Sequence, residues 1–191
     1  EGVIRLLVQE VDRMPADVAG LYGWMLDGAE RHFGQVWTRA FVEAIAASRS
    51  GWRESDLEAL MPVMSGEAWD PLRFATLRRG LRAHVVQRGA HAQWDFAHAQ
   101  MRQAVEHRAT HHRRDLSAVH DAVGRHLLAL RRDDAVHESE TLVHLMRGSD
   151  PGARLAPVVC AGFTDSHYLR THLGTAVYGF FPLRAMDPEL A

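Results

Sequence analysis

Apolar residues recur at helical spacing through most of residues 1–150, and Pro or Gly interrupts the pattern at several points. A helix with this pattern carries an apolar face that must pack against another element. Pro15 favours a new helix start and Gly34 a helix stop, so three helices are predicted, over residues 3–14, 16–33 and 35–48.

Two further helices are predicted after Gly51. Ser55-Asp56-Leu57-Glu58 has the form of a capping box and indicates a short helix that ends near Met61. Pro71 begins another helix, over residues 71–83, because Pro is favoured at the first helical position. Its apolar spacing predicts an inward face of Leu72, Phe74, Leu77 and Leu81, with Arg73, Arg78, Arg79 and Arg82 outward.

A hairpin is predicted next, because two β-like runs, Val85-Val86 and Trp94-Asp95-Phe96, flank a turn that contains Gly89. Three helices followed by a two-stranded hairpin, over about 35–96, are typical of a winged helix. In that fold the helix at 71–83 occupies the place of a DNA-reading helix.

The pattern changes near residue 150. Before it, apolar spacing predicts helices from about His98, over 115–131 and over 136–147. After it, two short apolar runs flank a helical stretch, which predicts a small strand–helix–strand appendage over 151–191. We therefore expect a mainly α fold, with a helical and winged-helix segment over 1–150 and this β-α-β appendage behind it.

Composition excludes several function classes. The chain has no Lys, so its 22 basic residues are all Arg, and it cannot form a P-loop or a lysine Schiff base. The lack of Lys and Asn indicates a GC-rich, bacterial genome. The single Cys160 forbids an internal disulfide. Since the sequence shows neither a membrane-spanning run nor a signal peptide, we expect a cytoplasmic protein without membrane contact.

Charge is spread unevenly along the chain. Residues 1–70 carry a net charge of −6 and residues 71–114 a net charge of +7. Such a basic stretch can attract phosphate or an acidic surface. Its outward Arg78, Arg79 and Arg82 are candidates for nucleic-acid binding through phosphate contacts. The favoured alternative is a solvated or intramolecular role, opposite the acidic first 70 residues.

Several short motifs lie at turn and apolar positions of residues 1–150: Met14-Pro15-Ala16-Asp17-Val18, Ala47-Ser48-Arg49-Ser50-Gly51-Trp52, Phe96-Ala97-His98, His126-Leu127-Leu128, and Glu140 with His144-Leu145. Together they resemble the region that follows the nucleotide-binding core in signal-transduction ATPases of the STAND/NACHT class. The resemblance implies a winged helix with further helices, which packs on the NTPase core of the same or a partner protein. Such a region regulates and relays; it does not hydrolyse nucleotide.

Residues 153–191 resemble a different family, the aminoacylase/carboxypeptidase family of dinuclear zinc peptidases. The resemblance rests on Gly162-Phe163-Thr164-Asp165-Ser166, Tyr168-Leu169-Arg170 and Val177-Tyr178-Gly179-Phe180-Phe181-Pro182. It implies that the loop with Gly162, Thr164, Asp165 and Ser166 binds a substrate carboxylate, and the free N–H groups of a helix start favour an anion there too. The family's metal-binding motifs are missing from the chain, so no catalytic residue, metal or cofactor is expected.

Histidines offer only weak metal candidates. His107 and His111 lie four residues apart, on one helical face, but neighbouring Arg residues repel a cation. His137-Glu138 with His144 lacks the spacing of a zinc-protease helix. We expect His98 to cap or pack at the start of its helix. The Trp residues are expected at the core or its edge: Trp24, Trp37, Trp52, Trp69 and Trp94.

Three functions follow from these observations. The leading expectation is a non-catalytic regulatory segment of a larger bacterial STAND-type ATPase. One alternative is a fragment of a zinc-dependent amidohydrolase or carboxypeptidase, and the other is a DNA-binding winged helix.

Overall fold

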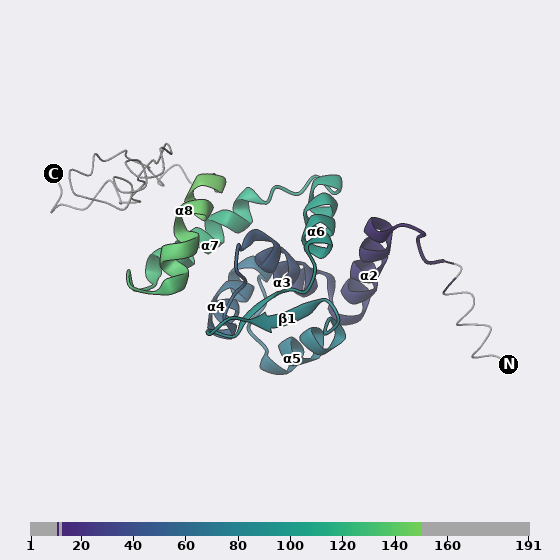
Figure 1. The fold of residues 1–191 in the computed structure, drawn as a ribbon, viewed down its shortest axis with the longest axis horizontal. Helices are drawn as coiled ribbons and strands as arrows, with labels where there is room; N and C mark the ends of the chain where they lie inside the picture. Colours follow the sequence, from purple (N-terminus) through teal and green to yellow (C-terminus); the bar gives the residue numbers. More distant parts are fainter. Residues whose placement is uncertain (1–10, 12, 150–191) are drawn as a thin grey trace, which may run out of the picture. The chain divides into compact units, whose positions relative to one another are not determined.

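The computed structural model describes residue 11 and residues 13–149, which belong to one compact unit, Glu1–Ser149 (Figure 1). This part of the chain is mainly helical with a small antiparallel sheet, as predicted. The appendage expected over 151–191, and nearly all of the helix expected over 3–14, lie outside the described residues. Within the described residues, no helix has both the length and the apolar character that crossing a membrane requires.

Two helices open the described unit, α2 (Val18–Phe33) and α3 (Gln35–Ala47), and both confirm the predicted pattern. Asp17 caps α2, since its carboxylate accepts a hydrogen bond from Gly20 N–H at 2.8 Å. Gly34 joins the helices with a φ of 94°, in a region that favours glycine. Every residue of α3 from 40 to 47 is buried, so α3 is the central helix of the unit.

The apolar residues of α2 do not all turn inward. Leu26 and Ala29 are buried against the core, whereas Val18 and Leu21 are 61% and 42% exposed. Both sets recur at helical spacing, so periodicity alone could not decide which face of α2 turns inward.

The next two helices are α4 (Glu54–Ser65) and α5 (Pro71–Gly80). The capping prediction for α4 was wrong by two residues, because Arg53 is the N-cap and Asp56 accepts from its backbone N–H at 3.1 Å. This helix also continues well past Met61. In α5 the prediction of an inward Leu72 was wrong: Leu72 is 77% exposed, since it lies on the side opposite Phe74.

The hairpin consists of β1 (Val85–Arg88) and β2 (Gln93–Phe96), with Val85 opposite Phe96. Its turn spans 89–92, one residue longer than the predicted Arg88–Ala90 turn, and Gly89 has a φ of 70° there. Trp52 extends the sheet by an isolated bridge, in which Trp52 and Trp94 exchange backbone hydrogen bonds of 3.1 and 2.7 Å. The stretch before α4 is thereby fixed to the edge of the hairpin.

Three helices complete the described unit: α6 (Ala99–His111), α7 (Ser117–Ala129) and α8 (Ala135–Arg147), all close to their predicted bounds. In Figure 1, α7 and α8 lie side by side, and α7 packs against α3 and α4. The core lies around α3 and the hairpin. Of the Trp residues, Trp24 is outside this core and only partly buried, Trp69 lies at its edge, and the buried ones are Trp37, Trp52 and Trp94.

Candidate functional site

Most guanidinium groups of the basic stretch, residues 71–114, bind acceptors inside the unit. Arg73, Arg108 and Arg114 form ion pairs with Glu67, Asp27 and Glu43, which belong to the acidic first 70 residues. Arg88 and Arg102 donate to carbonyl groups, and Arg102 also pairs with Asp95. Contact with the acidic first 70 residues is therefore confirmed for Arg73, Arg108 and Arg114, while Arg88 and Arg102 are held by carbonyl groups and, for Arg102, by Asp95.

The three arginines singled out as nucleic-acid candidates lie together. Arg78, Arg79 and Arg82 line a groove of about 240 Å³ between α5 and the hairpin, together with Ala75, Val85 and Trp94. We call this the α5 groove. Arg78 and Arg79 lie in the last turn of α5, beside the buried Phe74 and Leu77, and Arg82 follows the end of the helix. Arg79 and Arg82 are exposed, as predicted, whereas Arg78 is half-buried against the Trp94 and Phe74 rings.

Arg78 is held in place without using its hydrogen-bond donors. Its guanidinium carbon lies 5.1 Å from the ring centroid of Trp94 and 5.7 Å from that of Phe74. A guanidinium in this position is attracted by the π faces of the rings. The Trp94 ring packs edge-to-face against Phe74 at 6.1 Å, so the two rings together orient Arg78 while leaving its N–H groups available.

Arg79 and Arg82 are exposed, and neither has an acceptor or an acidic partner within the described part of the chain. Among the described residues, no carboxylate lines the α5 groove. The groove therefore gathers three positive charges that no acidic lining residue compensates, unlike the five paired arginines.

A second cluster of charged groups is buried where α8 meets the loop after α3. Glu140 of α8 is fully buried, and its carboxylate accepts from the backbone N–H groups of Arg49 and Ser50, both at 3.0 Å. The Ser50 hydroxyl donates a third bond of 2.9 Å. Because a buried carboxylate needs such donors, the contact fixes α8 to this loop.

Two histidines extend this cluster. His144 lies one turn after Glu140, its Nε2 atom is 3.6 Å from the Glu140 carboxylate, and its Nδ1 atom is 3.0 Å from Nδ1 of His120 on α7. One of the two facing Nδ1 atoms donates and the other accepts. Burial, followed by the nearby His144 and Arg147, lowers the pKa of His120 to about 4. His120 is therefore neutral at physiological pH.

The charge of Glu140 is stabilised by its partners. Burial alone would raise the pKa of Glu140, but the contact with His144 and the hydrogen bonds from Ser50 and Arg49 outweigh it, so its pKa is lowered. The carboxylate is ionised in the folded protein and holds three donors of the loop.

A second set of hydrogen bonds and ion pairs joins α4 to α7 and α8. Asp56 is buried and accepts from Arg53 Nε at 2.8 Å, and it contacts Nε2 of His126 on α7 at 3.0 Å. Arg53 reaches on to Asp134, the N-cap of α8, at 2.8 Å. Burial would raise the pKa of Asp56, yet the bonds from His126 and Arg53 lower it to about 2.

A larger hollow of about 500 Å³ lies between α2, α3 and α6, but two of its three arginines are paired with its two acids, Asp27 and Glu30. Glu30 accepts from Arg39 at 2.9 Å and pairs with Arg108 at 3.1 Å, and Arg108 also pairs with Asp27 at 2.5 Å. Since the floor is an ion-pair network, this hollow offers a ligand less uncompensated charge than the α5 groove does.

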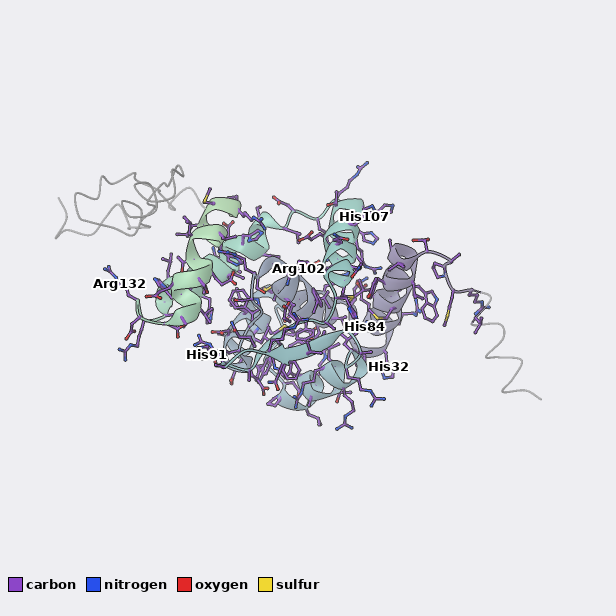
Figure 2. The ribbon with its side chains drawn as sticks, in the orientation of Figure 1. His32, His84, His91, Arg102, His107 and Arg132 are labelled. Atoms are coloured by element: carbon purple, nitrogen blue, oxygen red, sulfur yellow. The ribbon has the colours of Figure 1, made fainter. Side chains whose placement is uncertain are left out.

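The histidine candidates are dispersed. His107 and His111 are exposed on α6, and Figure 2 shows His107 on the outside of the unit, while His98 is the N-cap residue of α6. In the part of the chain that the structure describes, no three His, Cys, Asp or Glu side chains gather as metal ligands. Cys160 and the anion-binding loop expected from Gly162, Thr164, Asp165 and Ser166 lie outside the described residues.

Sequence reasoning missed two features of these sites. Trp94 forms a wall of the α5 groove, and its strand is bridged to Trp52. No local sequence pattern predicts this bridge, because the two residues are distant in sequence. The spacing of Glu140 and His144 places them on one face of α8, but their partners Ser50 and His120 come from distant parts of the sequence.

The chain matches no protein-family model, no curated protein and no solved structure. The candidate sites therefore stand on their own geometry.

Proposed function

We propose that residues 1–150 form a non-catalytic regulatory segment of a STAND-type signalling ATPase, which packs on the NTPase core and relays its nucleotide state. We also propose that residues 35–96 form a winged helix. The order of α3, the bridging Trp52, α4, α5 and the two hairpin strands supports this assignment. A cytoplasmic location is part of the same proposal.

The observation that carries the proposal is a set of apolar side chains left in water before and within the first turns of α2. Val11, Met14, Val18 and Leu21 are 62%, 41%, 61% and 42% exposed. Exposed apolar side chains that concentrate in one stretch mark a protein contact surface. A neighbouring NTPase core of the same or a partner protein is the surface that they would cover.

The contacts that hold the helices of the unit together support the proposed relay. The α7–α8 pair is joined to the loop after α3 by Glu140, and to α4 through the Arg53–Asp56–His126 contacts. Buried polar networks that are fully bonded are rigid. If the NTPase core displaced α2 or α3, α8 would therefore move with them as part of one rigid unit.

The test uses the natural full-length protein. The reading frame, or that of a partner protein, is expected to encode a Gly-x-x-x-x-Gly-Lys-Ser/Thr loop, and the double variant Val18→Ser/Leu21→Ser is expected to change its ATP hydrolysis several-fold. The control is Val63→Ser on α4, an equally exposed valine (63%) outside this surface, and it should leave hydrolysis unchanged. Equal effects of both variants, or no P-loop in either protein, would refute the proposal.

A further inference from the structure

We propose that the α5 groove is a binding site for phosphate groups, held by Arg78, Arg79 and Arg82 beside the Trp94 ring. This inference is independent of the regulatory role proposed above. That role rests on exposed apolar side chains near the start of α2, whereas this site consists of charged side chains at α5.

The first argument is uncompensated charge. Five of the nine arginines of residues 71–114 are bound to acceptors of the unit, as described above, whereas the three of the α5 groove have none among the described residues. Three like charges that line one groove repel one another unless an anion lies between them. The groove thus has the electrostatic form of an anion site.

The second argument is orientation. Arg78 is fixed against the Trp94 and Phe74 rings, at 5.1 and 5.7 Å, through its face. Its N–H donors stay free at the edge of the guanidinium, where they can form paired hydrogen bonds to two oxygens of one phosphate. A pre-oriented guanidinium loses less side-chain entropy on binding than a mobile one does.

The third argument is size. A groove of about 240 Å³ is smaller than the 300–1,000 Å³ of typical small-molecule pockets. It accommodates a phosphate group while the rest of the molecule stays outside. The expected ligand is therefore a terminal or bridging phosphate of a larger molecule, or a small inorganic phosphate such as pyrophosphate.

The structure also argues against base reading. A DNA-reading helix contacts bases with its N-terminal residues. At that end of α5 the N-cap carboxylate of Asp70 accepts from Leu72 and Arg73 N–H groups, and Leu72 is exposed. An acidic cap repels the nucleic-acid backbone there, so contact is expected through phosphates only, at the other end of α5, and without sequence preference.

Two sources can supply this chemistry, a nucleic-acid backbone or a free phosphate compound. The experiment titrates the 191-residue chain with a short labelled DNA duplex by fluorescence anisotropy, and with inorganic pyrophosphate by calorimetry. The test variant is Arg79→Gln/Arg82→Gln. The control is Arg113→Gln/Arg125→Gln, which removes the same charge from two exposed arginines outside the groove.

If the source is nucleic acid, duplex binding weakens about 40-fold between 50 and 200 mM salt, as expected for three phosphate contacts. The test variant then loses about 10-fold or more in affinity. The slope of its log affinity against log salt concentration falls to the value expected for about one phosphate contact. If the source is a free phosphate compound, pyrophosphate binds in a groove-dependent way and the duplex does not.

The proposal is overturned if neither probe binds, or if both double variants weaken binding equally, since that result would reflect net charge alone. Thermal unfolding of each variant checks that a loss of binding does not come from a loss of folding. All four substituted side chains are exposed and make no hydrogen bond to a described residue, so the variants should unfold at the wild-type temperature.

Discussion

Glu140 accepts hydrogen bonds from both the backbone N–H and the hydroxyl of Ser50, at 3.0 and 2.9 Å, across 90 residues of sequence. The two residues join the last described helix to the loop that follows the central helix. Since the carboxylate is fully buried, it cannot exchange these donors for water.

Replacing Glu140 by Ala should therefore destabilise the fold strongly. The substitution removes the carboxylate that accepts from the N–H groups of Arg49 and Ser50, and each hydrogen bond to a charged group contributes about 1.5–3 kcal/mol. Urea unfolding followed by circular dichroism measures the change. The matched variant Glu138→Ala, on the exposed side of α8, should cost less than about 1 kcal/mol. Similar costs for the two variants would contradict the described contact.

Gly51 should not tolerate a side chain. Its φ is 84°, and a Cβ atom there would lie 2.9 Å from the Trp94 carbonyl carbon, in backbone that cannot move away without breaking the Trp52–Trp94 bridge. Gly66 has a φ of 72° with open space around it, so Gly66→Ala meets only the left-handed penalty of about 1–2 kcal/mol. Gly51→Ala should cost clearly more by the same unfolding measurement. Equal costs would show that the close approach to Trp94 does not constrain the loop.

Local signals in the sequence predicted most helix boundaries. Pro71 and Gly34 act within a few residues of themselves, and the structure uses both as predicted, whereas α2 begins at Val18 behind the cap residue Asp17 and not at Pro15. The capping of α4 was misassigned because Ser55 also matches the local pattern, whereas the capping box of the structure joins Arg53 and Asp56, and the cap residue is an arginine, which the usual preference for Ser, Thr, Asp or Asn does not favour.

The candidate sites were predictable only in part. The spacing of Arg78, Arg79 and Arg82 predicts their shared face, because the argument needs only one helix. That the neighbouring arginines are paired depends on acids in other helices, such as Asp27 for Arg108 and Glu43 for Arg114. Pairing between distant helices produces no periodic pattern in the sequence. The sequence therefore could not show which arginines of the basic stretch are paired and which line the α5 groove.

Replacing Arg102 by Lys should destabilise the fold. One of its terminal nitrogens donates to the carbonyl oxygens of Ile45, Ala46 and Ser48 at the end of α3, and the other pairs with Asp95 at 2.8 Å (Figure 2). An ammonium group cannot reach both sets, since it lacks the planar fork. Arg102→Lys should cost about 2 kcal/mol. Differential scanning calorimetry should show a melting point several degrees lower, whereas Arg125→Lys, at an exposed site on α7, should not shift it.

Stability should fall as the pH drops from about 6.5 towards 4, because of His120. Burial, His144 and Arg147 together lower its pKa to about 4 in the folded protein, only partly offset by Asp121, while the unfolded chain titrates near 6.5. The unfolded state thus takes up the proton first, and the stability contribution, complete above pH 6.5, is lost as acid is added. The expected loss between pH 7 and pH 5 is about 2 kcal/mol.

The measurement compares urea unfolding at pH 7 and pH 5 for the wild type, His120→Asn and His91→Asn. Asn can still form a hydrogen bond with Nδ1 of His144 but does not titrate, so His120→Asn should lose stability at pH 7 and show a smaller decrease down to pH 5. His91 lies exposed in the hairpin turn, and its variant should follow the wild-type pH profile. If His120→Asn retains the full pH dependence, the acid sensitivity comes from other groups and the buried imidazole pair does not control it.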